Sequence, residues 1–137
     1  MSTLLDHYFS FHGRLARLPF FIRGIYLVIA AVVLFFVSVA LFSNGGRIWW
    51  WLGLIEVIVC LSVLGVGSVS LIVRRLHDLG FSGYHVIWVG AAELGSTVLS
   101  YGPPVLMLLA LPLAAVDLWL TFWPGMASAN RFGAMPD

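Results

Sequence analysis

The sequence contains no lysine, and charged residues of all kinds make up only 9% of its 137 residues. Hydrophobic residues make up 61%, against roughly 45–50% in soluble domains. Seven arginines, six acidic residues and four histidines are too few to cover the surface of a soluble protein of this length. The scarcity of charge therefore excludes an ordinary soluble domain and indicates a single integral membrane domain over residues 1–137.

Motifs for catalysis, metals and redox chemistry are also missing. The one cysteine, Cys60, lies in an apolar run and is predicted to be a small hydrophobic residue, without a disulfide or CxxC partner. His7/His12 and His77/His85 lack the i, i+4 spacing that one helix would use for a metal, and there is no nucleophile elbow, P-loop or HExxH pattern. We therefore expect a non-enzymatic protein with no metal, haem or other cofactor; ligands from separate segments are the alternative left open.

Four apolar runs dominate the chain, at about residues 20–42, 48–73, 86–102 and 105–123. Each approaches the roughly 20 residues that a membrane-spanning helix needs, and turn signals rich in glycine and proline separate them. Pro112 is predicted to kink the last run. The pattern predicts an all-α fold, a four-transmembrane-helix bundle. The third run is the shortest, and whether it crosses fully stays open.

The arginines are unevenly distributed between the two ends of these runs. Arg47 alone lies on one side, and six arginines lie on the other: Arg14, Arg17, Arg23, Arg74, Arg75 and Arg131. Cytoplasmic segments carry the excess of positive charge in membrane proteins. We therefore expect both termini, the 74–85 loop and the 124–137 tail to be cytoplasmic, with no role in nucleic-acid binding because no basic run is present.

The N-terminal segment 3–18 has the pattern of an amphipathic helix. Apolar residues such as Tyr8 and Leu15 recur every three or four residues, and Arg14 and Arg17 lie on the opposite side. Such a helix suits the membrane surface, so we predict an N-terminal interfacial helix over 3–18. The alternative is that its apolar face packs on the cytoplasmic loops.

The stretch RRLHDLGFSGYH, residues 74–85, concentrates polar chemistry between two apolar runs. The second helix should continue to about Leu79, with Gly80 as its C-terminal glycine. Asp78 then opposes the helix dipole and needs a cationic partner. Arg74 is the local candidate, but we predict an arginine from another segment: Arg14, Arg17 or Arg131.

Three blocks of the sequence resemble the family DUF805, bacterial inner-membrane proteins of unknown function. They are FSFHGRLARLPF at 9–20, RRLHDLGFSGY at 74–84, and GMASANRFGAMP at 125–136. The chain departs from the family's pattern at Tyr84, Ser128 and Met135. The resemblance implies a small multi-span protein of the bacterial inner membrane and brings no established activity.

All three blocks lie on the side predicted to be cytoplasmic, where they could form one polar cap. Such a cap would suit an accessory or scaffold subunit, or a lipid-binding module. It would bind anionic head groups of membrane lipids, another membrane protein or a second copy of the chain. Its predicted members are Arg14, Arg17, Arg74, Arg75, His77, Asp78, Asn130 and Arg131.

Charged residues within the apolar runs suggest a second function. Glu93 and Asp117 both fall roughly 10 Å below the cytoplasmic surface, from the 1.5 Å rise per helical residue, and Arg23 could reach them. Together they could serve a small transporter or an ion or proton pathway. The other interpretation is separate snorkelling or hydrogen bonding between helices. Glu56 lies in the outer half of its run.

Overall fold

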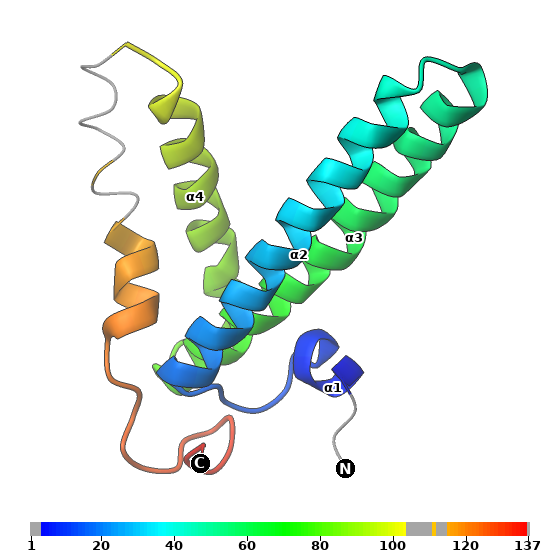
Figure 1. Ribbon diagram of the computed structural model, residues 1–137. Helices are drawn as coiled ribbons and strands as arrows, with labels where there is room; N and C mark the ends of the chain where they lie inside the picture. The colour runs from blue at the N-terminus through cyan, green and yellow to red at the C-terminus, as the bar shows by residue number, and fades with distance from the viewer. Residues whose placement is uncertain (1–3, 104–110, 112–114, 137) are drawn as a thin grey trace. The chain divides into compact units, whose positions relative to one another are not determined.

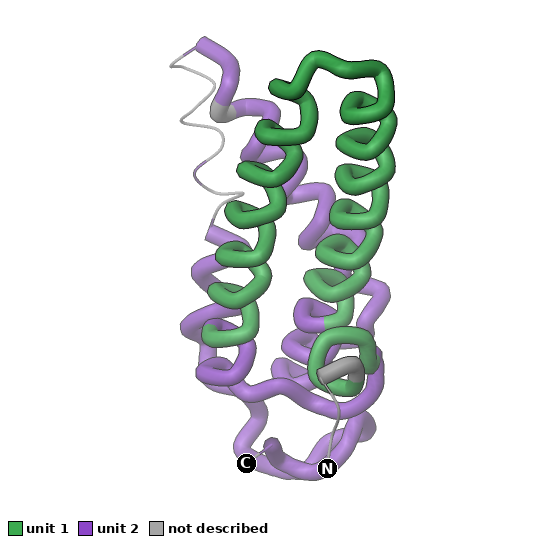
Figure 2. The backbone as a smooth tube through the Cα atoms, turned by 45° about the vertical axis from the view of Figure 1, so that its right-hand side comes forward, with its two compact units in different colours: residues 1–10, 22–70 green, residues 11–21, 71–137 purple. Residues whose placement is uncertain are grey.

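The computed structural model describes residues 4–103, 111 and 115–136. The described chain is all-α apart from an isolated bridge between Asn130 and Gly133. It divides into two compact units, residues 1–10 with 22–70 and residues 11–21 with 71–137 (Figure 2). Its helices are α1 (Leu4–Phe9), α2 (Arg17–Ser43), α3 (Arg47–Asp78), the 3-10 helix η1 (Gly83–His85) and α4 (Val86–Ser100); residues 115–122 are also helical.

The first unit is dominated by the α2–α3 hairpin (Figure 1). Both helices are long and apolar enough to cross a membrane, and they contain the predicted runs 20–42 and 48–73. No residue of α2 is buried. Exposed apolar side chains along a whole helix are costly in water and favourable in lipid.

Small and polar side chains lie where the two helices of the hairpin meet. The Glu56 carboxylate accepts a hydrogen bond from the Ser38 hydroxyl across the pair at 2.5 Å and one from the Cys60 thiol at 3.1 Å. Cys60 therefore has a polar partner, which its apolar sequence context did not predict. Gly53 leaves room for the Phe42 ring of the opposite helix, as small residues do in membrane helix pairs.

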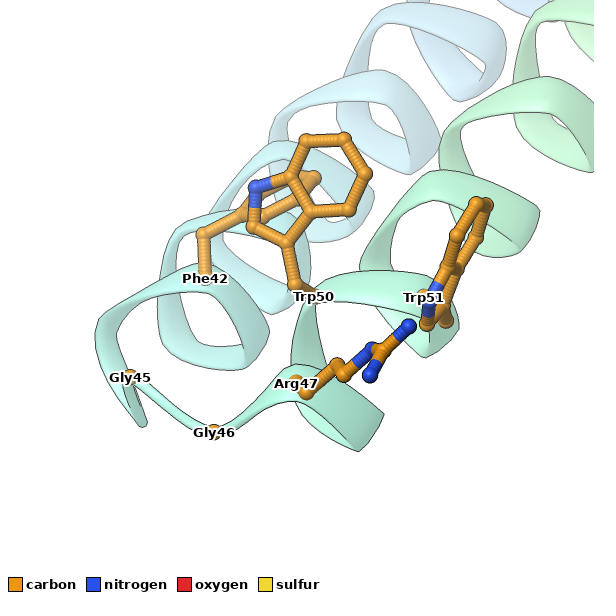
Figure 3. A pocket seen from close by; sticks show the side chains of 6 residues that line it. All are labelled: Phe42, Gly45, Gly46, Arg47, Trp50 and Trp51. Atoms are coloured by element: carbon orange, nitrogen blue, oxygen red, sulfur yellow. The ribbon is translucent and has the colours of Figure 1, made fainter.

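The turn of the hairpin carries a pocket lined by aromatic rings, glycines and an arginine (Figure 3). Gly45 takes a positive φ of 68°, which glycine adopts without strain. The rings of Phe42 and Trp50 pack edge to face, with their centroids 6.1 Å apart. Trp51 packs in the same way on Trp50. Arg47, which begins α3, lines the same pocket.

The predicted continuous helix over residues 3–18 is wrong. Helix α1 ends at Phe9, and α2 begins only at Arg17. Between them Gly13 takes a φ of 83°, and the Leu15 amide donates a hydrogen bond to the Arg74 carbonyl at 3.1 Å. The segment is not helical because its contact with the end of α3 provides a hydrogen-bond partner for its backbone. The same contact buries the side chains of Arg14 and Leu15.

The second unit contains the end of α3, η1, α4 and the helix at residues 115–122. Its core is formed by Leu76, Val89 and Leu120. Helix α3 ends in a Schellman motif, because the Gly80 amide bonds to the His77 carbonyl and the Phe81 amide to that of Leu76. The φ of 86° at Gly80 confirms the predicted C-terminal glycine.

The third and fourth apolar runs are described in part. Helix α4 covers 15 residues of the third run. It is preceded by η1, whose N-cap Ser82 makes no capping hydrogen bond through its side chain. In the fourth run the structure describes residues 111 and 115–123. The predicted kink at Pro112 lies outside the described residues.

Candidate functional site: a buried arginine–aspartate cluster

Asp78, at the end of α3, lies between two arginines in the second unit. Its Oδ1 accepts hydrogen bonds from Nε and Nη2 of Arg14 at 3.1 and 2.9 Å. Its Oδ2 accepts one from Nη1 of Arg75 at 2.6 Å. The prediction that Asp78 pairs with an arginine of another segment is therefore confirmed for Arg14. The second partner is Arg75, one turn earlier on α3, whereas the local candidate named from the sequence was Arg74.

Backbone carbonyls occupy the remaining donors of both guanidinium groups. Arg14 donates to the carbonyls of Ser128 at 2.6 Å and Met126 at 2.5 Å. Arg75 donates to those of Leu120 at 2.7 Å and Trp123, at the end of the helix over residues 115–122. Carbonyls in the last turn of a helix lack partners within the helix and carry partial negative charge. The two arginines thus join α3, the segment after Gly13 and the C-terminal tail.

The cluster leaves no free space around the carboxylate. A Cβ atom added to Gly125 would overlap the Asp78 carboxyl group, so only glycine fits there without a shift. The Met126 amide donates to the Asp78 carbonyl at 2.9 Å. Asp78 is 2% exposed and Arg75 is fully buried. The tail is therefore held to α3 through both the side chain and the backbone of one residue.

Two positive charges and one negative charge are buried together in this cluster. Burial lowers the pKa of the Arg75 guanidinium, the charge of Asp78 raises it, and the positive charge of Arg17 lowers it further. A buried ion needs several partners to offset its desolvation, and the carbonyls at residues 120–128 supply them. The Arg14–Asp78–Arg75 cluster keeps a net positive charge.

A second group of polar residues continues from the cluster along α3. The His77 Nδ1 lies 3.2 Å from the Gly13 carbonyl, so Nδ1 carries the proton as donor. Its ring stacks on Phe132 at 4.0 Å, and the Arg131 guanidinium lies over the Phe132 ring at 4.7 Å. Asn130 donates to the His77 carbonyl at 2.9 Å. Three of the predicted cap residues, His77, Asn130 and Arg131, are therefore joined around Phe132.

The pKa of His77 is lowered, chiefly because its partial burial disfavours the charged imidazolium. The hydrogen bond to the Gly13 carbonyl acts in the opposite direction, and the positive charges of Arg131 and His12 add to the lowering. His77 lies beyond the apolar run 48–73 of α3, close to the cluster. Burial thus shifts the imidazole towards its neutral form.

The remaining predicted cap residues differ in exposure. Arg17 is exposed and lines a pocket with apolar residues of the second unit. Arg74 is half-buried and gives its carbonyl to Leu15. The predicted cap thus consists of a buried part, Arg14, Arg75 and Asp78, and a more accessible part that includes Arg17 and Arg131.

The charged residues within the apolar runs are divided between the two units. Glu93 and Asp117 both belong to the second unit, and they lie close enough for the charge of Asp117 to act on Glu93. Arg23 belongs to the first unit, where its Nη1 donates to the His7 carbonyl at 3.4 Å. Glu56 is paired with Ser38 and Cys60 in the hairpin.

Within the described residues, no group of three or more His, Cys, Asp or Glu side chains is placed to hold a metal ion. The buried cluster offers hydrogen bonds and charge neutralisation but no nucleophile beside a base. Sequence reasoning missed the role of Gly125 and of the carbonyls at 120–128. Glycine in the block at 125–136 was the only signal for that close approach, because a carbonyl is present in every residue and marks no position.

The fold and the cluster together define a class: a small all-α protein with two helices long enough to cross a membrane and a buried ionic cluster joining distant segments. The chain matches the family model of DUF805, a protein family of unknown function, over residues 8–134 and belongs to that family. The matched range contains all the residues of the cluster. No curated protein and no solved structure matches the chain.

Proposed function

We propose that this protein is a non-enzymatic inner-membrane protein, an accessory or scaffold subunit that acts through its polar cap. Four spans would place both termini and the cap in the cytoplasm. The observation that supports this most directly is the Arg14–Asp78–Arg75 cluster. Every guanidinium nitrogen of the cluster has at least one protein acceptor, and the cluster ties three distant segments into one surface. Such a cluster builds a platform and offers no vacancy for a substrate.

The exposed residues of the cap would make the contacts with partners. An anionic ligand cannot reach Arg14 or Arg75 without breaking their hydrogen bonds inside the protein. Arg17 and Arg131 are exposed. They would contact anionic lipid head groups, a partner membrane protein or a second copy of the chain.

Two measurements test the proposal. Cysteine-accessibility labelling in a Cys60→Ala background should label position 130 from the cytoplasm and position 103 from outside. Purification in mild detergent should recover the protein with lipid or a protein partner. Position 130 labelled from outside would overturn the topology, and stoichiometric metal or a Soret band in the purified protein would overturn the cofactor-free scaffold.

The proximity of the Glu93 and Asp117 carboxyl groups favours a second candidate, a proton or ion pathway. In liposomes with an imposed pH gradient, the native chain should then carry a proton flux that Glu93→Gln abolishes. Ser96→Ala is the control, because the Ser96 hydroxyl bonds only to the Glu93 backbone carbonyl on the same helix. Equal flux in native and Glu93→Gln vesicles would exclude the pathway.

A further inference from the structure

A small pocket of about 220 Å³ lies beside the cluster, between the start of α2 and the end of the helix at 115–122. We call it the Arg17 pocket. It combines one cation and one hydroxyl with apolar walls. Its lining residues are Arg17, Leu18, Phe21, Thr121 and Phe122, and all of them belong to the second unit.

Arg17 carries a positive charge that the described residues do not neutralise. The two ion pairs of the described chain use Arg14 and Arg75, and no acid or carbonyl of the described residues is bound to Arg17. Its charge acts unfavourably on the Arg75 guanidinium. Because the neighbouring cluster is itself positive, two sources of positive potential meet at the pocket, and an anion placed there would be stabilised by both.

The apolar walls restrict which anion fits. Leu18, Phe21 and Phe122 are exposed at 63%, 49% and 67%, so they surround the charge with hydrocarbon. A hydrated inorganic anion or an acidic peptide gains little from such walls. An amphiphile with an anionic head and an acyl chain satisfies both parts, because its chain covers the apolar side chains while its head meets the guanidinium.

We propose that the Arg17 pocket is a binding site for the phosphate group of an anionic phospholipid. Arg17 would pair with the phosphate, and the Thr121 hydroxyl would donate one hydrogen bond to it. The acyl chain would lie along Leu18, Phe21 and Phe122. The inference rests on the membrane setting of the proposed function and adds a specific ligand and site to it.

The test measures lipid binding to the purified full chain. Native mass spectrometry in detergent would count bound phosphatidylglycerol and phosphatidylcholine over a lipid titration. Arg17→Gln should weaken phosphatidylglycerol binding about tenfold, the equivalent of about 1.4 kcal/mol, and leave phosphatidylcholine unchanged. Arg47→Gln is the control: it removes an exposed arginine that lies outside the polar cap and does not line the pocket, and it should change binding less than twofold.

Additional measurements separate lipid binding from a folding defect and from binding of free phosphate. Arg17→Lys should keep more than half of the affinity if charge dominates, and its unchanged melting temperature would show that the fold is intact. Inorganic phosphate at millimolar concentration should not displace the lipid; displacement would assign the pocket to a free phosphate and overturn the proposal. Equal losses in Arg17→Gln and Arg47→Gln would also overturn it, since they would show unspecific attraction.

Failure of the lipid site and failure of the proposed function give different experimental results. Loss of phosphatidylglycerol binding in Arg17→Gln together with outside labelling of position 130 would keep the lipid site and reject the cytoplasmic cap. Cytoplasmic labelling with unchanged lipid binding in Arg17→Gln would keep the cap and reject the lipid site.

Discussion

The two units of the chain are stabilised in different ways. In the first unit, α2 has no buried residue, and the described polar link between α2 and α3 runs from Ser38 to Glu56. In the second unit, Arg14, Arg75 and Asp78 are each at most 6% exposed and share hydrogen bonds over 64 residues of sequence separation.

The difference shows that the few charged side chains of this protein stabilise its irregular segments rather than its apolar helices. Apolar helices need no ion pairs to remain helical in lipid, since their backbone hydrogen bonds are internal. Segments without that regularity, such as residues 10–16 and 123–136, need other partners for their backbone groups. The chain places two of its seven arginines where they bind carbonyls of these irregular segments. We therefore expect damage to the cluster to cost more than equivalent damage to the hairpin.

The largest effect is expected for Asp78→Asn. The variant keeps the shape of the side chain but leaves two buried guanidinium groups without a counter-charge, which should cost about 3–5 kcal/mol. Thermal unfolding in detergent would measure the loss. Glu56→Gln removes a charge from the hairpin and should cost about 1 kcal/mol or less. Similar losses in both variants would refute the distinction between the units.

Gly125→Ala should come next, at about 1–3 kcal/mol. The added methyl group meets the Asp78 carboxylate and must displace either the ion pair or the tail. Gly90→Ala is the control, because nothing lies within 4 Å of a Cβ at that helical position, and alanine should be neutral or slightly stabilising there. Melting temperatures of the two variants give the comparison, and a neutral Gly125→Ala would contradict the close packing.

A double-mutant cycle sharpens the assignment of the partner. Arg14→Gln and Asp78→Asn should be coupled by about 1 kcal/mol or more, because the two side chains are in direct contact. Arg17→Gln and Asp78→Asn should add within about 0.5 kcal/mol. Unfolding free energies of the singles and doubles provide both numbers. Coupling through Arg17 and not Arg14 would mean that a different arginine closes the cluster.

The smallest effect concerns His77 and pH. Its pKa in the folded protein is lowered, so the unfolded chain, with a histidine pKa near 6.5, takes up the proton first as the pH falls. The contribution of His77 is thus complete above about pH 7 and is lost as the pH drops below about 6.5 towards the folded pKa.

The loss should be small, because it comes from one partly buried group. Stability measured between about pH 7 and 5 should therefore fall less steeply in His77→Gln than in the native chain. His85→Gln alters an exposed histidine and should keep the native slope. The same slope in the native chain and His77→Gln would show that protonation of His77 is not linked to unfolding.

Much of the fold could be predicted because it depends on local composition. The apolar runs at 20–42 and 48–73 predict α2 and α3, and Gly80 predicts the end of α3, since these signals act within one or two helical turns. The helix predicted over 3–18 failed for the opposite reason. Its periodicity was real, but Gly13 and a hydrogen bond from Leu15 to Arg74 decided the outcome, and that bond spans 59 residues of sequence.

The sequence alone determined that the chain is rich in long apolar helices and that Asp78, at a helix C-terminus, needs a cation. Only the tertiary structure decided that the cation is Arg14 together with Arg75, that Gly125 must be small, and that the carbonyls near residue 123 complete the cluster. The physical reason is that helix formation is governed by nearby residues. The choice among several arginines depends instead on which one the folded backbone brings within hydrogen-bonding distance of the carboxylate.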